Sequence, residues 1–573
     1  MPMIRPMFGP MFQRMFQRMA ASAALVTLAG ALAAPQALAQ SAEALKADAT
    51  TPGDVLTYGM GYNNQRYSAL KQINASTVDK LAPIWSYSLN NSQSQESQPI
   101  VFDGVMYVTT HSSTVALNPI TGKQIWKMEH ELPQDVFKYA CCGILNRGAA
   151  ILNGTLFRVT LDAHVIALDA KTGKQLWKSK AANYQDGHAM TSAPLIAGGV
   201  VMTGIAGGEY GTRGFVDGWD PATGKQLWRF YTTAAPGEKG GNTWPGDTAS
   251  KGGAPTWLTG TYDPELDLVY WGTGNAGPWN PEVRKGDNLY VCSVIAFRPK
   301  TGEMVWHYQF SPNDPYDYDA TEVGMLVDLK VDGQMRKVLA QANRNGFFYV
   351  LDRANGKLLA ANPYVKVNWA DKIDMATGRP VESEVTKRIR AGGDEIVWPS
   401  VLGGKNWTPM SWNPTTGLAY ANTLEMSWPY QIAKPEYKRG EWYLGINFRG
   451  VNFPPKGTAN GHLSAIDPMT GKAKWQMAWP GQPSMAGTLS TGGGLVFTGA
   501  ATGEFIAVDA NTGQKLYEFQ TGSGIIGLPV TWEQGGKQYV SIVVGAGGVW
   551  ALVGDERMAA TPGGGSVWTF ALR

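Results

Sequence analysis

One phrase recurs along the chain, and no other feature restricts the possible fold as strongly. It contains apolar residues, an Asp or Asn (Arg298 in one copy), three further turn residues closing on Gly, and a run that usually reaches an aromatic residue. The eight copies are ALNPITGKQIW at Trp126, ALDAKTGKQLW at Trp177, GWDPATGKQLW at Trp228, AFRPKTGEMVW at Trp306, VLDRANGKLLA at Asp352, SWNPTTGLAYA at Asn413, AIDPMTGKAKW at Trp475 and AVDANTGQKLY at Asp509. Each copy predicts a β-hairpin, because Asp or Asn caps such a turn and Gly takes its left-handed position.

The spacing of these hairpins predicts an all-β, eight-bladed β-propeller. The Asp or Asn positions mostly lie 42 to 61 residues apart, with one wider gap from Asp220 to Arg298. A period of this size in a strand-rich chain is typical of propeller blades, with a β-solenoid or a row of small sandwiches as the alternatives. The aromatic residue falls on the strand after the turn, so we expect tryptophan-docking repeats in which it packs against the neighbouring unit. With 69 Gly and 34 Pro, the chain is poor material for helices.

The N-terminus predicts export. Arg5, Arg14 and Arg18 form a positive region before a short apolar run, MAASAALVTLAGALAA, and ALA ending at Ala39 is a typical cleavage site. Residues 1–39 are therefore expected to be a signal peptide and residues 40–573 a single propeller domain located in the periplasm. A retained amphipathic anchor is the alternative. The apolar run is too short for a membrane span, so we expect no integral membrane segment after cleavage.

The charge of the mature chain argues against nucleic acid and anionic lipid as partners. Without the three leader arginines, the 49 basic residues fall to 46 and equal the 46 acidic ones. A neutral chain without a run of Lys or Arg has no electrostatic footprint for a polyanion. Small molecules or another protein, including a second copy of this chain in a homodimer, are the expected partners.

The cysteines and histidines limit the chemistry. Cys141 and Cys142 are adjacent in KYACCGILNRG, and Cys292 is the third cysteine. An oxidising compartment would let two of the three pair and leave the other as a buried thiol. The sequence contains no CxxCH, so we expect no attached c-type haem. Six His residues without a spaced pair argue against a zinc or iron site.

Four further motifs occur between the repeats: ACCGILNRG, GGEYGTRG, GTGNAGPWN and PNDPYDYD. Together with the repeat they resemble the quinoprotein alcohol dehydrogenases, a family that includes methanol and ethanol dehydrogenases using pyrroloquinoline quinone (PQQ). The resemblance spans nearly the whole mature chain. It implies oxidation of an alcohol to an aldehyde or ketone, with PQQ on the propeller axis. A non-catalytic envelope scaffold shares the repeat but predicts neither the adjacent cysteines nor the acidic motifs.

The resemblance also implies the cofactor-binding residues. In the family, PQQ lies between a Trp ring and a vicinal disulfide, which Trp257 and the pair Cys141 and Cys142 match here. Two reduced thiols are the alternative for that pair. Arginines suit a quinone with three carboxylates, because a guanidinium pairs with a carboxylate through two hydrogen bonds. The other positions that match the family's PQQ contacts are Glu96, Arg147, Thr191, Gly207, Gly208, Arg344 and Asn406.

The same resemblance implies a metal site and a catalytic base. Glu209, Asn275 and Asp317 match the family's metal ligands, and their oxygen donors suit a hard cation. Asp319 matches a second Asp of the lanthanide-dependent members, so we expect a lanthanide ion; Ca²⁺ is the alternative, with Asp319 then a turn residue. The metal would act as a Lewis acid on the quinone, and Asp317 would accept the alcohol proton. Arg344 would stabilise negative charge on the quinone oxygens.

Three departures from the methanol dehydrogenase pattern bear on the substrate. Ala206 replaces an expected Ser, Pro255 replaces an expected Thr, and Met485 stands where a Trp covers the substrate cavity. We therefore expect an alcohol larger than methanol; sugars, polyols and aldehydes remain alternatives. Without a haem of its own, the enzyme is expected to pass electrons to a separate, soluble cytochrome c.

Overall fold

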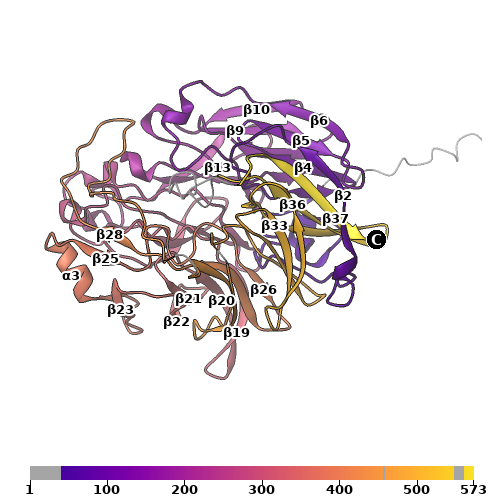
Figure 1. Cartoon of the computed structure of the whole chain (residues 1–573). Helices are drawn as coiled ribbons and strands as arrows, with labels where there is room; N and C mark the ends of the chain where they lie inside the picture. The colour runs from indigo at the N-terminus through magenta and orange to yellow at the C-terminus, as the bar shows by residue number, and fades with distance from the viewer. Residues whose placement is uncertain (1–39, 456–457, 480, 548–560) are drawn as a thin grey trace, which may run out of the picture. The chain divides into compact units, whose positions relative to one another are not determined.

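Strands account for nearly all the regular secondary structure (Figure 1). The structure is a computed structural model that describes residues 40–455, 458–479, 481–547 and 561–573. Within these ranges, the α-helices are α2 (Ala42–Ala47) and α3 (Glu384–Arg390), and neither has the length and apolar character that a membrane-spanning helix needs. The predicted signal peptide, residues 1–39, lies outside the described residues.

The strands form eight sheets of four or five strands, which confirms the predicted eight-bladed propeller. In chain order, and from the innermost strand outwards, the first four are β3 (Ile100–Phe102), β4 (Val105–Thr109), β5 (Ser113–Leu117) and β6 (Gln124–Glu129); β7 (Ala150–Leu152), β8 (Thr155–Val159), β9 (His164–Asp169) and β10 (Gln175–Lys180); β11 (Leu195–Ala197), β12 (Val200–Gly204), β13 (Phe215–Trp219) and β14 (Gln226–Tyr231); β15 (Thr261–Asp263), β16 (Leu268–Gly272), β17 (Ser293–Phe297) and β18 (Met304–Gln309).

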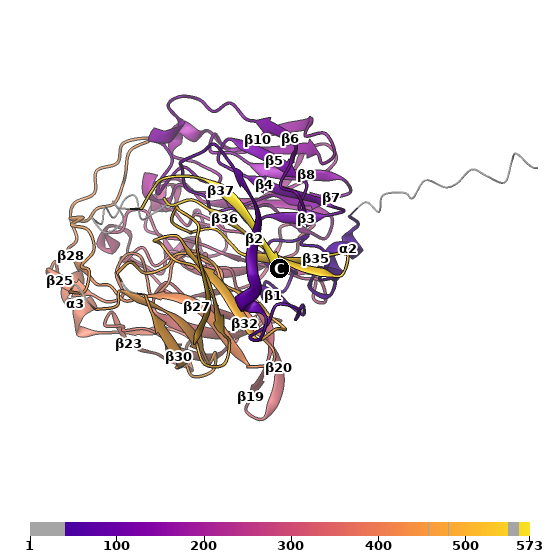
Figure 2. The same ribbon diagram turned by 45° about the vertical axis from the view of Figure 1, so that its right-hand side comes forward.

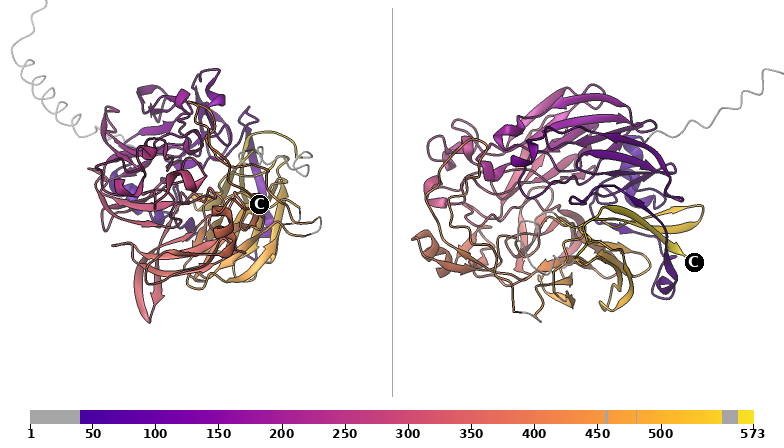
Figure 3. Two further views of the ribbon diagram at one scale, coloured as in Figure 1. Left: turned by 90° about the vertical axis from the view of Figure 1, so that its left-hand side faces the viewer. Right: turned by 45° about the horizontal axis from the view of Figure 1, so that its top comes forward.

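The other four sheets are β19 (Met325–Val331), β20 (Gln334–Ala342), β21 (Phe347–Asp352) and β22 (Leu358–Pro363); β26 (Ser411–Asn413), β27 (Leu418–Leu424), β29 (Gly461–Ile466) and β30 (Ala473–Ala478); β31 (Leu489–Thr491), β32 (Leu495–Gly499), β33 (Glu504–Asp509) and β34 (Lys515–Gln520), with β1 (Tyr67–Ser68) beside β31; and β35 (Val530–Gln534), β36 (Lys537–Val544), β37 (Ser566–Leu572) and β2 (Leu81–Ser88). The sheets follow one another around a ring, as the progression of colours shows (Figure 3). The last sheet closes the ring, because β2 pairs antiparallel with β37 from the C-terminal end (Figure 2).

The position of a strand in its sheet determines its side-chain pattern. The middle strands β5 and β13 are buried along their whole length. The outer strands β2 and β10 alternate between more and less exposed side chains, as strands with one solvent face do. Apolar side chains of neighbouring sheets pack together between the sheets and form the core.

The turns of the repeat are built as predicted. In the copy at Asp220, the carboxylate oxygen Oδ1 accepts hydrogen bonds from the backbone N–H and the hydroxyl of Thr223, both at 2.8 Å. Gly224 then adopts φ +69°, the left-handed conformation that glycine tolerates best. Seven of the copies lie at the turn between the third and fourth strands of a sheet.

The remaining copy, at Asn413, corrects the prediction in one respect. Asn413 lies between β26 and β27, the first two strands of the sheet that also contains the copy at Asp467. The sheet closed by β2 and β37 contains no copy. The predicted number of blades was correct, but the assignment of one copy to each blade was wrong, because the two chain ends build the last blade with a different sequence.

The repeat tryptophans dock on the next blade, as expected. The indole N–H groups of Trp126, Trp177, Trp228 and Trp475 each donate to a backbone carbonyl in the turn of the following repeat, at 3.0 Å. The ring also covers the turn glycine, since a Cβ on Gly224 would lie 2.5 Å from the Trp177 ring. Trp85 on β2 docks in the same way on Pro119 at 2.8 Å, although the repeat phrase does not include it.

The propeller has two ends that differ in construction. Neighbouring strands in each blade are antiparallel, so the turns between strands three and four all lie at one end, here called the turn end. The loops between strands two and three, and the connections from one blade to the next, lie at the opposite end, here called the loop end. The longest connection, from β22 to β26, contains α3, the ribbon β23 (Ala370–Ile373) with β24 (Pro380–Glu382), and β25 (Glu395–Val397), which pairs with β28 (Trp428–Tyr430).

Candidate active site

A cavity at the loop end collects most of the residues predicted for the site. It encloses about 660 Å³ of space not occupied by atoms, part of it open to solvent. Of its sixteen lining residues, twelve were predicted from the sequence: Glu96, Cys141, Cys142, Arg147, Thr191, Gly207, Glu209, Trp257, Asp317, Asp319, Arg344 and Asn406. Gly208 and Asn275 do not line the cavity and lie directly behind it. All fourteen residues lie either in a loop between the second and third strands of a blade or in a connection between blades.

Arg147 organises one side of the cavity. Its guanidinium forms an ion pair with Glu96 at 2.8 Å and donates to the Thr191 hydroxyl at 2.8 Å. The same group lies over the rings of Trp257, 4.8 Å from the centroid, and Trp407, at 4.9 Å. Its Nε is buried without a hydrogen-bond partner. An unpartnered donor on a residue that lines the cavity fits a cofactor that carries carboxylates.

Burial acts on both charges of this pair. It raises the pKa of Glu96, which Arg147 opposes, and it lowers the pKa of Arg147, which Glu96 opposes. Each charge therefore offsets part of the cost of burying the other.

Trp407 is the one aromatic lining residue that the sequence analysis missed. It follows Asn406 directly, and its backbone N–H donates to the Asn406 side-chain oxygen at 2.9 Å. Trp407 stands next to the predicted Asn406 in GGKNW, and this position could have indicated its role. The chain contains 21 Trp residues, however, and only the spatial neighbours of Trp407 distinguish it from the structural ones. Leu145 and Ala189 also line the cavity and were not predicted, and Ala206 lines it at the position where the family pattern has Ser.

The adjacent cysteines are joined. Cys141 and Cys142 form a disulfide with their Cα atoms 3.8 Å apart, and both line the cavity that Trp257 also lines. Cys292 is the buried free thiol, and burial raises its pKa well above the usual range. A thiol in that state is a poor nucleophile.

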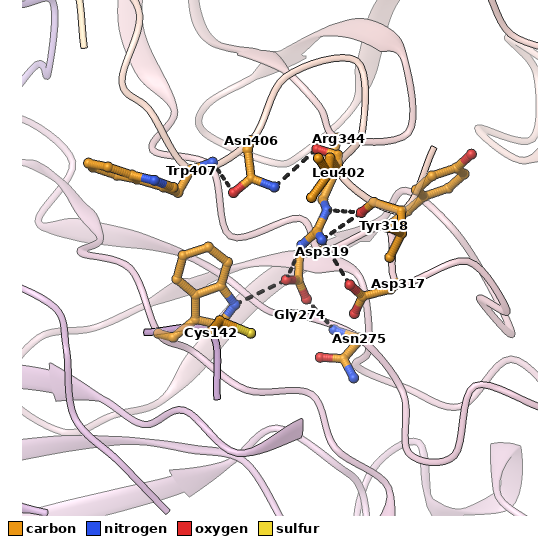
Figure 4. A network of polar contacts seen from close by, with 12 residues as sticks. Cys142, Gly274, Asn275, Asp317, Tyr318, Asp319, Arg344, Leu402, Asn406 and Trp407 are labelled. Carbon is orange, nitrogen blue, oxygen red and sulfur yellow. Dashed lines mark hydrogen bonds and ion pairs between the residues drawn. The ribbon is translucent and has the colours of Figure 1, made fainter. Parts of the chain in front are cut away.

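Asp319 connects three of the predicted residues (Figure 4). Its Oδ1 accepts a hydrogen bond from the backbone N–H of Asn275 at 2.5 Å. Its Oδ2 accepts from the Trp257 indole at 3.1 Å and from Arg344 at 2.5 Å. A carboxylate predicted only as a metal ligand thus also fixes the plane of the indole.

Asp317 is held by Arg344 and by its own backbone. Its Oδ2 accepts from the Arg344 guanidinium at 2.8 Å, while its Oδ1 is buried without a hydrogen-bond partner. Its φ is +63°, a left-handed conformation that is uncommon outside glycine and tends to occur at functional sites. Arg344 is itself anchored by donating to the Val401 carbonyl.

The electrostatics of this group are dominated by burial. Burial raises the pKa of Asp317 and of Asp319, and the Arg344 charge opposes it in both cases. Burial also raises the pKa of Glu209 to about 7, with Asp319 adding to the effect. Burial lowers the pKa of Arg344, but Asp317 and Asp319 outweigh it and raise that pKa overall. Positive charge entering beside these carboxylates would stabilise their ionised forms.

The oxygen donors fit a hard cation in part. Asn275 Oδ1 and Asp317 Oδ1 are both buried without hydrogen-bond partners, and such groups normally require one. Gly208 makes room for the first of them, since a Cβ there would lie 2.4 Å from Asn275 Oδ1. No group of three or more His, Cys, Asp or Glu side chains in the described ranges is arranged to hold a metal ion. The Asn275 amide would thus have to complete the ligand set, as the sequence analysis expected.

Comparison with known proteins identifies the family. The family described as "PQQ: Glucose/ethanol/alcohol dehydrogenase, beta-propeller domain" matches residues 56–372 and 458–540. Quinohemoprotein alcohol dehydrogenase ADH IIB of Pseudomonas putida is 43% identical over 523 residues, which cover 88% of this chain and 75% of that protein. This chain belongs to the PQQ-dependent alcohol dehydrogenase family. It is therefore an oxidoreductase that oxidises alcohols with PQQ, and the family combines PQQ with a metal ion.

Two further members have similar sequence or structure. Quinoprotein alcohol dehydrogenase PedH of Pseudomonas putida strain KT2440 is 40% identical over 552 residues, which cover 91% of each chain. The solved structure of a europium-containing methanol dehydrogenase superimposes with a TM-score of 0.87 at 36% identity, and covers 92% of this chain and 100% of that chain. The PQQ-dependent alcohol dehydrogenase fold thus extends over the whole propeller described above.

Proposed function

We propose that this chain is a periplasmic PQQ-dependent dehydrogenase that oxidises alcohols larger than methanol and passes electrons to a separate cytochrome c. The observation that supports the catalytic assignment best is the arrangement of Asp317. Its Oδ2 is bound by Arg344, and its Oδ1 is left without a partner at the edge of the cavity. A carboxylate held in this way can accept a proton at Oδ1 without losing its orientation.

Asp317 is the proposed catalytic base. It would take the hydroxyl proton of the alcohol on a carboxylate oxygen that the metal leaves free, while Arg344 holds the side chain in place and favours its ionised form. When bound, PQQ supplies the two-electron acceptor and the metal ion polarises the quinone as a Lewis acid. Arg344 would also stabilise negative charge that develops on the quinone side of the cavity.

The other lining residues are proposed to bind and orient the cofactor. Trp257 would offer a flat surface for stacking, fixed by its bond to Asp319, and the Cys141–Cys142 disulfide would cover the opposite face. Arg147 would pair with a cofactor carboxylate through its free Nε. The remaining proposed contacts are Glu96, Thr191, Gly207, Gly208 and Asn406.

We propose a lanthanide ion as the metal, with Ca²⁺ as the alternative. Glu209, Asp317 and Asp319 line the same cavity, and three carboxylates drawn together around a cation would suit a trivalent ion better than a divalent one. The similarity to the europium-containing methanol dehydrogenase supports the same proposal. The alternative rests on Asp319, whose two oxygens already accept three hydrogen bonds and would have to give some up to bind a metal.

The test compares metals in reconstituted enzyme. Metal-depleted protein is loaded with PQQ and either La³⁺ or Ca²⁺, and dye-linked oxidation of a panel of alcohols is measured for the wild type and Asp319→Ala. We expect La³⁺ to support the higher activity, and Asp319→Ala to lose most of the La³⁺-dependent activity. Glu322→Gln is the matched control, because Glu322 is a buried carboxylate on the same segment that does not line the cavity. Wild-type activity with Ca²⁺ that equals or exceeds the activity with La³⁺, or an Asp319→Ala variant that keeps its La³⁺-dependent activity, would contradict the lanthanide assignment, and no turnover with either metal would contradict the catalytic one.

The substrate and acceptor proposals have their own support. Met485 is buried and replaces the Trp that covers the cavity in the methanol dehydrogenase pattern. The relatives include a quinoprotein ethanol dehydrogenase of Pseudomonas aeruginosa, which supports a longer alcohol, and a quinohemoprotein alcohol dehydrogenase, which supports a haem protein as acceptor. A higher kcat/KM for ethanol or a longer alcohol than for methanol, with reduction of a soluble cytochrome c, is the expected result.

A further inference from the structure

Two loops supply most of the proposed metal ligands, and their separation determines whether a cation fits. One follows β16 and carries Asn275; the other follows β18 and carries Asp317 and Asp319. The bond from the Asn275 N–H to Asp319 joins them through a residue that is itself a proposed ligand. A second connection involves none of the proposed ligands. It is built around Arg284.

Arg284 joins the two loops from behind. It is the last residue of the 3₁₀ helix η8 (Pro281–Arg284) and is completely buried. Its Nε donates to the Pro278 carbonyl at 2.6 Å, three residues after Asn275. One terminal nitrogen donates to the Asn288 side-chain oxygen at 2.7 Å, and the other donates to the Asp314 carbonyl, three residues before Asp317.

The chemistry of this contact requires an arginine. All three acceptors are uncharged oxygens, and they are met by the planar, fixed fork of a single guanidinium. A lysine has a single charged nitrogen with tetrahedral donors and cannot reproduce the three directions. Other buried arginines of the propeller, such as Arg158, are also bound by neutral oxygens, so the evidence for a role of Arg284 is that its acceptors lie on the two loops that carry Asn275 and Asp317.

We propose that Arg284 is a positioning residue for the metal site, which sets the separation between the Asn275 loop and the Asp317 loop. The inference rests on the proposed function, because it assumes that these loops hold a cation. Arg284 does not touch the cavity. It holds the backbone at Pro278 and Asp314. A shift of either backbone segment would move the unpartnered oxygens of Asn275 and Asp317.

Asn288 supports the same role. It is completely buried and adopts φ +56°, and its side chain both accepts from Arg284 and donates to the Arg284 carbonyl at 2.7 Å. The Asn313 side chain also donates to Asn288 Oδ1, at 2.8 Å. Asn288 therefore fixes the guanidinium from the side of the Asn275 loop and links it to the segment that leads to Asp317.

The test is Arg284→Lys in the PQQ-loaded, metal-depleted full chain, with La³⁺ and Ca²⁺ affinities measured by calorimetry and the melting temperature by scanning calorimetry. Arg158→Lys is the matched control. Arg158 is also buried and donates only to uncharged oxygens, those of Thr114, Thr110, His111 and Val159, and none of these residues lines the cavity. We expect similar losses of melting temperature in both variants, and an affinity loss of about 10- to 100-fold in Arg284→Lys alone, as for residues that orient metal ligands.

Three results separate the possibilities. If Arg284→Lys binds metal within twofold of the wild type, or if Arg158→Lys weakens binding equally, the positioning role is wrong. If wild-type protein binds neither La³⁺ nor Ca²⁺, the metal site itself is wrong, which is a different failure. Asn288→Gly keeps the inference testable should Arg284→Lys not fold, because glycine tolerates φ +56° and the change removes one Arg284 acceptor. We expect it to weaken metal binding about threefold, on the scale of one lost hydrogen bond, and unchanged affinity would contradict the role.

Discussion

The two ends of the propeller use polar side chains in opposite ways. At the turn end, Asp220 bonds to Thr223, three residues ahead, and the same arrangement recurs at Asp169 and Asp509. At the loop end, Trp257 donates a hydrogen bond to Asp319, which lies 62 positions away in the sequence, and Arg344 donates one to Asp317, 27 positions away. The turn end repeats one local solution, whereas the loop end contains contacts that occur once.

This difference predicts how each end responds to mutation. Polar groups at the turn end are partly exposed and hold a hairpin that blades on either side also support. Polar groups at the loop end are buried, and several bind the same partner, so removing one leaves others unsatisfied. Changes at the turn end should lower stability and leave catalysis intact. Changes at the loop end should impair cofactor binding or catalysis, in addition to any loss of stability.

The largest expected effect is on catalysis at the loop end. Asp317→Asn keeps the shape of the side chain but cannot accept a proton, so we expect kcat in the dye-linked assay to fall about 10³-fold. Asp220→Asn is the matched control at the turn end and should keep wild-type kcat. An Asp317→Asn variant that retains more than a tenth of wild-type kcat would remove the basis for assigning the base.

The next effect is on cofactor binding. Arg147→Lys cannot bond Glu96 and Thr191 together while lying flat between Trp257 and Trp407. We expect PQQ affinity to fall about 10- to 100-fold, the scale of one charged hydrogen bond, as measured by titration of the cofactor-free protein. Arg158→Lys again serves as the control, and an equal loss of PQQ affinity there would mean that the effect is one of general stability.

A third prediction concerns the contact between blades. Trp177→Ala removes an indole hydrogen bond to Pro221 and the ring that covers Gly224. The ring is half-buried, so we expect the free energy of unfolding to fall by about 2 kcal/mol. Denaturant unfolding measures this loss, and kcat/KM for alcohol should stay within twofold of wild type. A fall in kcat/KM that exceeds the change in stability would show that the two ends are not independent.

The smallest effect should come from a single turn carboxylate. The hydrogen bond with Thr223 lowers the pKa of Asp220 below its usual value. The carboxylate therefore stabilises the fold above its unfolded pKa of about 3.9, and this contribution disappears as the pH falls through the lower folded pKa. We expect Asp220→Asn to be less stable than wild type by at most about 1 kcal/mol at pH 7 and equally stable near pH 2. A difference that grows toward low pH would contradict the assignment.

The accuracy of the sequence predictions follows the same division. The blade number, the Asp220 turn and the docking of Trp177 were predicted, because each depends on residues close together in one copy. The copy at Asn413 was misassigned, since its letters fit the phrase while its strands occupy a different place in the blade. The double role of Asp319 and the presence of Trp407 in the cavity were also missed.

The sequence by itself determined the all-β repeat, the hairpin turns, the docking tryptophans and most of the residues that line the cavity. These features are local, or they are marked by motifs whose letters stand together. Only the tertiary structure decided which donors Asp319 binds, which oxygens of Asn275 and Asp317 stay unpartnered, and that Arg284 joins their loops. Those facts depend on groups that ring closure brings together from different blades. The direction of a side chain in a shared space cannot be read from its spacing along the chain.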